Sequence, residues 1–177
     1  EAINRVQPFE NVKRATEEAR EIGFTSISHD LIFGLPHQTM EGMMETINLT
    51  KELNPDRISF YSYAHVPWIK GNGQRGFKDE DVPKDELKRQ CYEEGKQRLL
   101  AYGYHEIGMD HFALERDGMY QSFKNGTLHR NFMGYTASKT QVMIGLGVSS
   151  ISDSWYSFAQ NEKSIEDYYA RLERNEI

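Results

Sequence analysis

The sequence predicts an α/β fold that forms part of a larger βα barrel, with parallel strands inside and helices outside. Strand-like and helix-like segments alternate along the chain. Four predicted strands are too few for a closed barrel, which takes about eight strands and ~250 residues. The hydrophobic fraction is 38%, which is low for a complete core even when glycine replaces tyrosine in the count. We therefore expect 1–177 to be one domain, the C-terminal half of a partial barrel; a complete small α/β domain is the alternative.

The first half of the chain passes twice from helix to strand. Apolar residues at near-helical spacing, beginning with Val12 and Ala15, indicate a helix that ends at Gly23. β-Branched and aromatic residues indicate the strands. Thr39 is a plausible N-cap for the second helix. In order, we predict a helix at 11–22, a strand at 25–33, a helix at 39–53 and a strand at 57–63.

The second half contains longer irregular stretches. Pro83 stands at a favourable helix start, and Gly103 is a typical helix end. In order, we predict a loop at 64–81, a helix at 85–102, a strand at 104–108, an irregular polar region at 113–140, a strand at 142–149 and a helix at 164–175.

Composition excludes several classes of function. The net charge of −6 and a pI near 5.5 argue against a general nucleic-acid-binding protein, which is usually basic. No apolar run reaches the ~18 residues of a membrane span, and we find no signal peptide. Residue 1 is Glu1 and not methionine, so we expect the natural chain to begin before it.

The chain has one cysteine, Cys91. A single thiol excludes an internal disulfide framework and a Cys-rich metal or iron–sulfur site made by this chain alone. A reducing, cytoplasmic location is the expectation.

Candidate site residues follow the predicted strands, because barrel enzymes place their chemistry at the carboxyl ends of strands. Asp30 lies inside an apolar strand, where a carboxylate is uncommon unless it is paired. It either accepts a hydrogen bond from a ribose or ammonium group, or is satisfied by a neighbouring arginine or the backbone. Ala64 has a small side chain that lets a flat heteroaromatic ring approach the backbone. A single histidine at a strand end, such as His65, is more often structural than catalytic.

Two further segments combine acidic, basic and aromatic residues. Asp110 and His111 place an acid beside a base after a strand, although adjacent side chains point in different directions and need not pair. His129 and Arg130 lie in a segment rich in aromatic residues. Arginine matches carboxylates with two parallel hydrogen bonds, and aromatic rings provide a platform for a flat ligand. The alternative is a solvated loop attached to the core by its rings. Arg5 is isolated, and its pattern is typical of a surface residue.

Five segments, taken together, resemble the oxygen-independent coproporphyrinogen III oxidases, which are radical S-adenosylmethionine enzymes of haem biosynthesis. The first two are shared with close relatives, whereas the last two resemble the true oxidases rather than the related haem chaperones. The segments are Asp30-Leu31-Ile32-Phe33-Gly34-Leu35-Pro36, Leu53-Asn54-Pro55-Asp56-Arg57, Tyr63-Ala64-His65, Gly108-Met109-Asp110-His111-Phe112 and His129-Arg130-Asn131-Phe132-Met133-Gly134-Tyr135-Thr136.

The resemblance implies a radical-SAM-type barrel that holds a [4Fe–4S] cluster and S-adenosylmethionine. It implies oxidative decarboxylation of two propionates of coproporphyrinogen III to vinyl groups, which gives protoporphyrinogen IX, with an electron donor for the cluster as a further partner. Arg5, Asp30 and Ala64 match residues that contact S-adenosylmethionine. Ile151 matches another such position after a one-residue difference in length.

The resemblance leaves the substrate-binding residues and the cluster ligands less completely assigned. Coproporphyrinogen carries four carboxylates that need cationic partners, so Asp110, His111, His129 and Arg130 are our candidates for binding it; no catalytic residue is assigned. The family's Cys-x3-Cys-x2-Cys cluster motif is absent, and Cys91 is predicted to pack inside a helix. We therefore expect a fragment that lies between the cluster loop and the family's C-terminal domain and is inactive alone. A haem- or porphyrin-binding relative without oxidase activity is the alternative.

Overall fold

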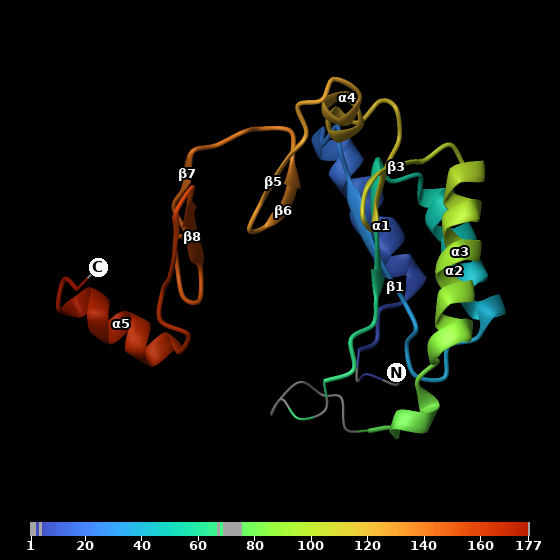
Figure 1. Cartoon of the computed structure of the whole chain (residues 1–177), viewed down its shortest axis with the longest axis horizontal. Coiled ribbons are helices and arrows are strands. Elements are labelled where there is room, and N and C mark those ends of the chain that lie inside the picture. Colours follow the sequence, from blue (N-terminus) through green and yellow to red (C-terminus); the bar gives the residue numbers. More distant parts are fainter. Residues whose placement is uncertain (1–2, 4, 67, 69–75, 177) are drawn as a thin grey trace. The chain divides into compact units, whose positions relative to one another are not determined.

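The computed structural model describes residues 3, 5–66, 68 and 76–176 (Figure 1). The backbone contacts divide the chain into two compact units, which we call the N-terminal unit (1–121) and the C-terminal unit (122–177). Each unit is described by itself, and the expectation of one domain stays a prediction. Along the described chain, no helix is both long and apolar enough to cross a membrane.

The N-terminal unit begins with the predicted alternation of helix and strand. The first two predicted helices and strands are confirmed within two or three residues. The Thr39 hydroxyl caps the second helix by accepting a hydrogen bond from the Gly42 amide at 3.1 Å. Gly23, with φ of 105°, ends the first in a left-handed conformation. The elements are α1 (Phe9–Ile22), β1 (Ser28–Phe33), α2 (Met40–Leu53) and β2 (Arg57–Ser62).

The sheet of this unit is mixed, which corrects the expectation of parallel strands throughout. Its order is β1-β2-β4-β3, where β3 is His105–Gly108 and β4 is His111–Ala113. β1 and β2 are parallel, but β4 pairs antiparallel with both β2 and β3. The two residues between β3 and β4 allow only a hairpin, because a parallel crossover needs about a dozen residues or more.

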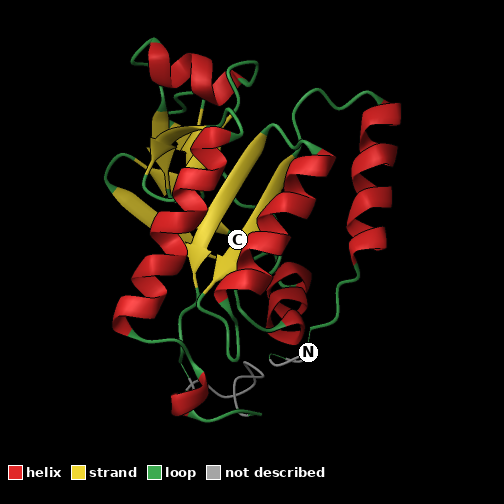
Figure 2. Cartoon of the chain, turned by 90° about the vertical axis from the view of Figure 1, so that its right-hand side faces the viewer, coloured by secondary structure: helices red, strands yellow, loops and turns green. Residues whose placement is uncertain are grey.

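Helices cover one face of this sheet. The remaining elements are the short 3-10 helix η1 (Asp79–Asp81), α3 (Asp85–Ala101) and α4 (Gly118–Lys124), which spans the division between the units. Figure 2, viewed from the side of α2 and α3, shows helices in front of the strands. Apolar residues from the strands, α2 and α3 form the core: Phe33, Met43, Ile47, Ile58, Phe60, Cys91, Leu99, Tyr104 and Phe112.

Gly95 explains how closely α3 approaches the sheet. A Cβ atom at this position would lie 2.6 Å from the ring of Phe60 and 3.2 Å from the side chain of Ile47. Real Cβ atoms do not approach other atoms so closely. Because only glycine leaves this space, the Phe60 ring fills the gap between strand β2 and the helix.

Two buried carboxylates tie the N-terminal unit together. Asp56, only 1% exposed, accepts hydrogen bonds from Arg20 of α1, from Arg116 at 2.7 Å and from the Ile27 amide at 2.8 Å. Burial acts to raise the pKa of Asp56, but these three donors outweigh it and hold the pKa below its ordinary value. Asp117 is similarly held by Arg57 at 3.1 Å.

The C-terminal unit consists of two small antiparallel sheets and a helix. Short strands and a hairpin occupy part of the region predicted to be irregular, and the closing helix is confirmed with Ser164 as its N-cap. The elements are β5 (His129–Asn131) paired with β6 (Gly134–Thr136), then β7 (Val142–Met143), β8 (Ile151–Ser154), β9 (Ser157–Gln160) and α5 (Ile165–Glu173).

The strand predicted at 142–149 is wrong after its first two residues. Only Val142 and Met143 pair with a neighbouring strand, and they do so antiparallel. Gly147 and Ser149 have positive φ values of 97° and 61°, which turn the backbone out of an extended conformation. The apolar run therefore forms a glycine turn that leads into β8.

Candidate functional site

Asp30 and His111 lie on the sheet face opposite α2 and α3. Side chains alternate between the two faces of a strand, and the register pairs Asp30 with Ser59 and Ser59 with His111. Asp30 is exposed. From the sequence we expected a carboxylate inside an apolar strand that needs a partner. In the structure, the side chain of Asp30 points away from the core.

Asp110 and His111 form a hydrogen-bonded pair. The Asp110 carboxylate lies 2.9 Å from Nδ1 of His111, whereas the alternation of side chains along a strand predicts that these neighbours need not pair. Two features of the tight β3–β4 turn explain the difference. Met109 adopts a left-handed conformation, with φ of 48°, and the strand register shifts between Glu106 and Gly108. The turn thus takes Asp110 out of the regular alternation of a strand.

This pair is anchored to the core of the sheet. The backbone carbonyl of Asp110 accepts a hydrogen bond from the Phe60 amide at 2.7 Å. The His111 ring makes an edge-to-face contact with Tyr61 at 5.8 Å. Both paired side chains keep partial exposure, 32% for Asp110 and 19% for His111. The imidazole is therefore oriented at Nδ1 by a carboxylate, which suits a group that exchanges a proton or binds an anion.

A second group of residues surrounds Ala64, just beyond β2. The Tyr63 carbonyl accepts a hydrogen bond from the Lys88 ammonium at 2.8 Å. His65 places Nε2 2.8 Å from the Asp79 carboxylate, and its ring lies 5.3 Å from that of Phe77. His65 thus has a partner within the chain.

Two buried polar atoms flank Ala64. Tyr63 Oη and His65 Nδ1 are buried and have no hydrogen-bond partner within the described part of the chain. Burial also raises the pKa of Tyr63. Buried polar groups normally have a partner, so a ligand that offers polar groups beside Ala64 fits this place.

The positions of Asp30 and Ala64 favour an elongated ligand. Ser59, the register partner of Asp30, lies within β2, and Ala64 follows the end of that strand by two residues. An adenosyl group joined to an amino acid is elongated in this way. Arg5 is exposed, as its sequence pattern predicts, and donates a hydrogen bond to the Gln7 side chain at 3.0 Å.

The remaining candidates lie in the C-terminal unit. Arg130 lies over the Tyr135 ring, 5.2 Å from its centroid, and the rings of His129 and Trp155 are 6.3 Å apart. Ile151 begins β8 and is half-buried. The structure therefore pairs Asp110 with His111 in one unit. In the other unit, His129 and Arg130 are successive residues of β5 and contact different rings.

The single cysteine of the sequence lies in the core of the N-terminal unit. Cys91 has 0% exposure within the core, as predicted, and burial raises the pKa of its thiol. Among the described residues, no group of three or more His, Cys, Asp or Glu side chains is arranged to hold a metal ion. The donors present do not fit a [4Fe–4S] cluster.

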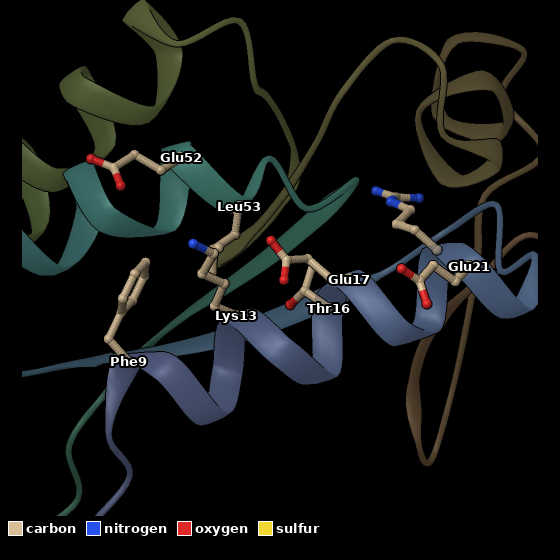
Figure 3. Close-up of a pocket in the computed structure, with 8 residues that line it drawn as sticks. Phe9, Lys13, Thr16, Glu17, Glu21, Glu52 and Leu53 are labelled. Atoms are coloured by element: carbon tan, nitrogen blue, oxygen red, sulfur yellow. The ribbon is translucent and has the colours of Figure 1, made fainter.

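A hollow on the helical side of the N-terminal unit contains none of the predicted site residues. Figure 3 shows charged side chains of α1 along it, together with the end of α2. Its lining is Phe9, Lys13, Thr16, Glu17, Arg20, Glu21, Glu52 and Leu53. The site candidates of the sheet lie on the opposite face, so we do not assign this hollow to the site.

Sequence reasoning missed several residues of these constellations. Asp79 begins the short 3-10 helix η1 in a charged segment, and only its contact with His65 distinguishes it. Lys139 and Trp155 are 16 residues apart and meet only in the folded unit, where the ammonium lies 5.1 Å from the indole centroid. The position of Trp155 could have been noticed in the sequence, because it stands between the two short segments that form the β8–β9 hairpin.

No family model matches the chain, but curated proteins do. It is 43% identical over 171 residues to the oxygen-independent coproporphyrinogen III oxidase of Escherichia coli, covering 97% of this chain and 37% of that protein. The proteins of that name from Paracoccus denitrificans and Synechocystis are 40% and 38% identical, over 96% and 98% of this chain. The chain thus spans less than two fifths of the length of these relatives.

A solved structure gives the same result. The coproporphyrinogen III oxidase of Escherichia coli, described as a radical SAM enzyme, matches with a TM-score of 0.91 and 42% identity. The match covers 99% of this chain and 40% of that one. Over nearly its whole length, the chain is therefore homologous to a segment of the oxygen-independent coproporphyrinogen III oxidases.

Proposed function

We propose that the chain forms the central part of an oxygen-independent coproporphyrinogen III oxidase. The whole enzyme would decarboxylate two propionates of coproporphyrinogen III oxidatively to vinyl groups and give protoporphyrinogen IX. The observation that carries this proposal is identity of about 40% across nearly the whole chain to proteins of that name. The parallel β1–α2–β2 unit would belong to a radical-SAM-type barrel, in a cytoplasmic protein.

Arg5, Asp30, Ala64 and Ile151 are the proposed contacts to S-adenosylmethionine. The buried Tyr63 Oη and His65 Nδ1 have no partner among the described residues, and these atoms and the elongated path from Asp30 support such a ligand. In this family, bound S-adenosylmethionine supplies the radical that removes hydrogen from the substrate. The exposed Asp30 carboxylate would accept hydrogen bonds from the ligand, and the small Ala64 would expose backbone to its flat base.

Asp110, His111, His129 and Arg130 are the proposed contacts to the substrate. The carboxylates of coproporphyrinogen would pair with the guanidinium of Arg130 and with the imidazoles. Asp110 would act as a positioning residue, because its carboxylate fixes the orientation of His111 at 2.9 Å. The aromatic side chains around Arg130 would exclude water from these pairs.

The cluster ligands and the electron donor would come from outside this chain, since its single cysteine is buried in the core. The chain alone therefore binds ligands without cleaving S-adenosylmethionine. Formation of 5′-deoxyadenosine by the purified chain with a strong reductant would contradict this statement.

Calorimetric titration with S-adenosylmethionine tests the proposal. We expect wild-type chain to bind it, and Asp30→Asn to weaken binding about tenfold, which corresponds to ~1.4 kcal/mol. Glu45→Gln, which removes an exposed carboxylate on the outer helix α2, is the matched control and should bind like wild type. Absence of binding by the folded wild-type chain, or equal binding by both variants, would overturn the assignment.

A further inference from the structure

The C-terminal unit contains a segment without acidic residues in an otherwise acidic protein. Between Asp117 and Asp153 the sequence has no Asp or Glu, although the chain carries a net charge of −6. The same stretch contains Lys124, His129, Arg130 and Lys139. The segment therefore contributes cations and no carboxylate of its own, which is the charge pattern of a site for anions.

Two of these cationic groups gather around one exposed ring. Trp155 lies at the tip of the β8–β9 hairpin and is 58% exposed. The Lys139 ammonium lies 5.1 Å from its centroid, and the His129 ring lies 6.3 Å away, tilted by 46°. An indole with this exposure offers a large flat surface, and the Lys139 ammonium lies over part of it.

Contacts between the two hairpins hold this arrangement. The Phe132 amide donates to the Asp153 carboxylate at 3.1 Å, and the rings of Phe132 and Phe158 are 5.8 Å apart. The Ser154 and Ser157 hydroxyls, 2.9 Å apart, close the turn that carries Trp155. The β5–β6 hairpin, which carries His129, is thereby tied to the hairpin that carries the indole.

We propose that Trp155, Lys139 and His129 form a platform that binds a tetrapyrrole bearing several carboxylates. One of its flat pyrrole rings would stack on the exposed part of the indole, while its carboxylates pair with the Lys139 ammonium and the His129 imidazole. This inference rests on the proposed function and adds Lys139 and Trp155 to the residues that bind the tetrapyrrole substrate. Lys139 serves as a single mobile charge, and Trp155 supplies the flat surface.

Fluorescence of a chain with one tryptophan tests the platform. The protein has two tryptophans, so Trp68→Phe leaves Trp155 as the only indole. The probe is coproporphyrin III, the stable oxidised porphyrin with four carboxylates. We expect it to quench the Trp155 emission with saturation, and its Soret band to shift at the same concentrations.

Charge variants separate the platform from porphyrin binding in general. We expect Lys139→Gln to weaken coproporphyrin III binding about tenfold and to affect protoporphyrin IX, with two carboxylates, less. Lys139→Arg should keep the affinity. Lys124→Gln removes a lysine from the same acid-free segment and should stay within twofold of wild type. Trp155→Leu should weaken binding in the Soret titration, with circular dichroism confirming the fold of each variant.

The outcomes distinguish this inference from the function on which it rests. A Soret shift without quenching, or equal affinity of Lys139→Gln and wild type, would overturn the platform and leave porphyrin binding in place. Quenching equal for coproporphyrin III and for an uncharged aromatic compound would identify a general apolar surface and also overturn it. Absence of any porphyrin binding by the folded chain would contradict both proposals.

Discussion

The two units differ in how they bury their side chains. The N-terminal unit has a continuous core in which Phe60 and Phe112 are no more than 1% exposed. Among the described residues of the C-terminal unit none is buried, and Leu146 is 87% exposed. Apolar burial is the dominant favourable contribution to folding. The stability of the chain should therefore come mainly from the N-terminal unit, whereas the C-terminal unit presents its apolar side chains as surface.

The largest expected effect compares one phenylalanine from each unit. Phe60→Ala should lower the free energy of unfolding by about 3–5 kcal/mol, because it removes a ring from a filled core. Phe158→Ala, at a side chain that is 66% exposed, should change it by less than about 1 kcal/mol. Urea denaturation monitored by far-ultraviolet circular dichroism measures both. Similar losses in the two variants would refute the contrast between the units.

The next effect concerns the buried carboxylates. Asp56→Asn should cost about 2–3 kcal/mol at pH 7, less than a fully buried pair because Arg20 and Arg116 keep 34% and 50% exposure. Asp153→Asn, its counterpart in the C-terminal unit, should cost less than about 1 kcal/mol. Denaturant titration of both variants at neutral pH checks the difference.

The same variant has a defined pH dependence. The pKa of Asp56 is lowered in the folded chain from its ordinary value of 3.8. Its contribution to the free energy of unfolding is therefore complete above pH 3.8 and is lost as the pH falls through the lower pKa of the folded state. The stability gap between wild type and Asp56→Asn should therefore be constant from pH 5 to 7 and shrink below about pH 4. A gap that widens in acid would contradict the assignment.

The smallest effect tests the close approach of α3. Gly95→Ala should cost about 1–3 kcal/mol, since the added methyl group would meet the Phe60 ring. Gly118→Ala provides the control, because a Cβ there meets nothing within 4 Å. Thermal unfolding of the two variants should show a lower midpoint for Gly95→Ala only.

Neighbouring residues were sufficient to predict elements whose ends depend on capping residues and glycine. Thr39 and Gly23 marked real helix ends, and residues 25–33 and 57–63 contain the two parallel strands. They were insufficient where pairing depends on distant residues. The three-residue strand β4 has no periodicity of its own and exists because it fits between β2 and β3. The run after Met143 reads as a strand, but its glycines and Ser149 turn the chain.

The site residues show the same division. Ala64 lies just beyond β2, as the pattern predicted, whereas Asp30 and His111 lie within strands. The exposure of Arg5 agreed with its sequence pattern. The Asp110–His111 contact did not follow, because it depends on the left-handed backbone at Met109. No sequence pattern links Trp155 with Lys139, since only tertiary folding brings the ammonium over the indole.

The double arginine contact of Asp56 has a consequence for the divergence of these proteins. The two cations come from separate places, Arg20 from α1 and Arg116 from the segment after β4. A single substitution at either position leaves the carboxylate with one cation. Each arginine can therefore be replaced during evolution while the other still neutralises Asp56. Asp56 has no such substitute. We expect lineages to exchange the arginines one at a time and to retain the aspartate.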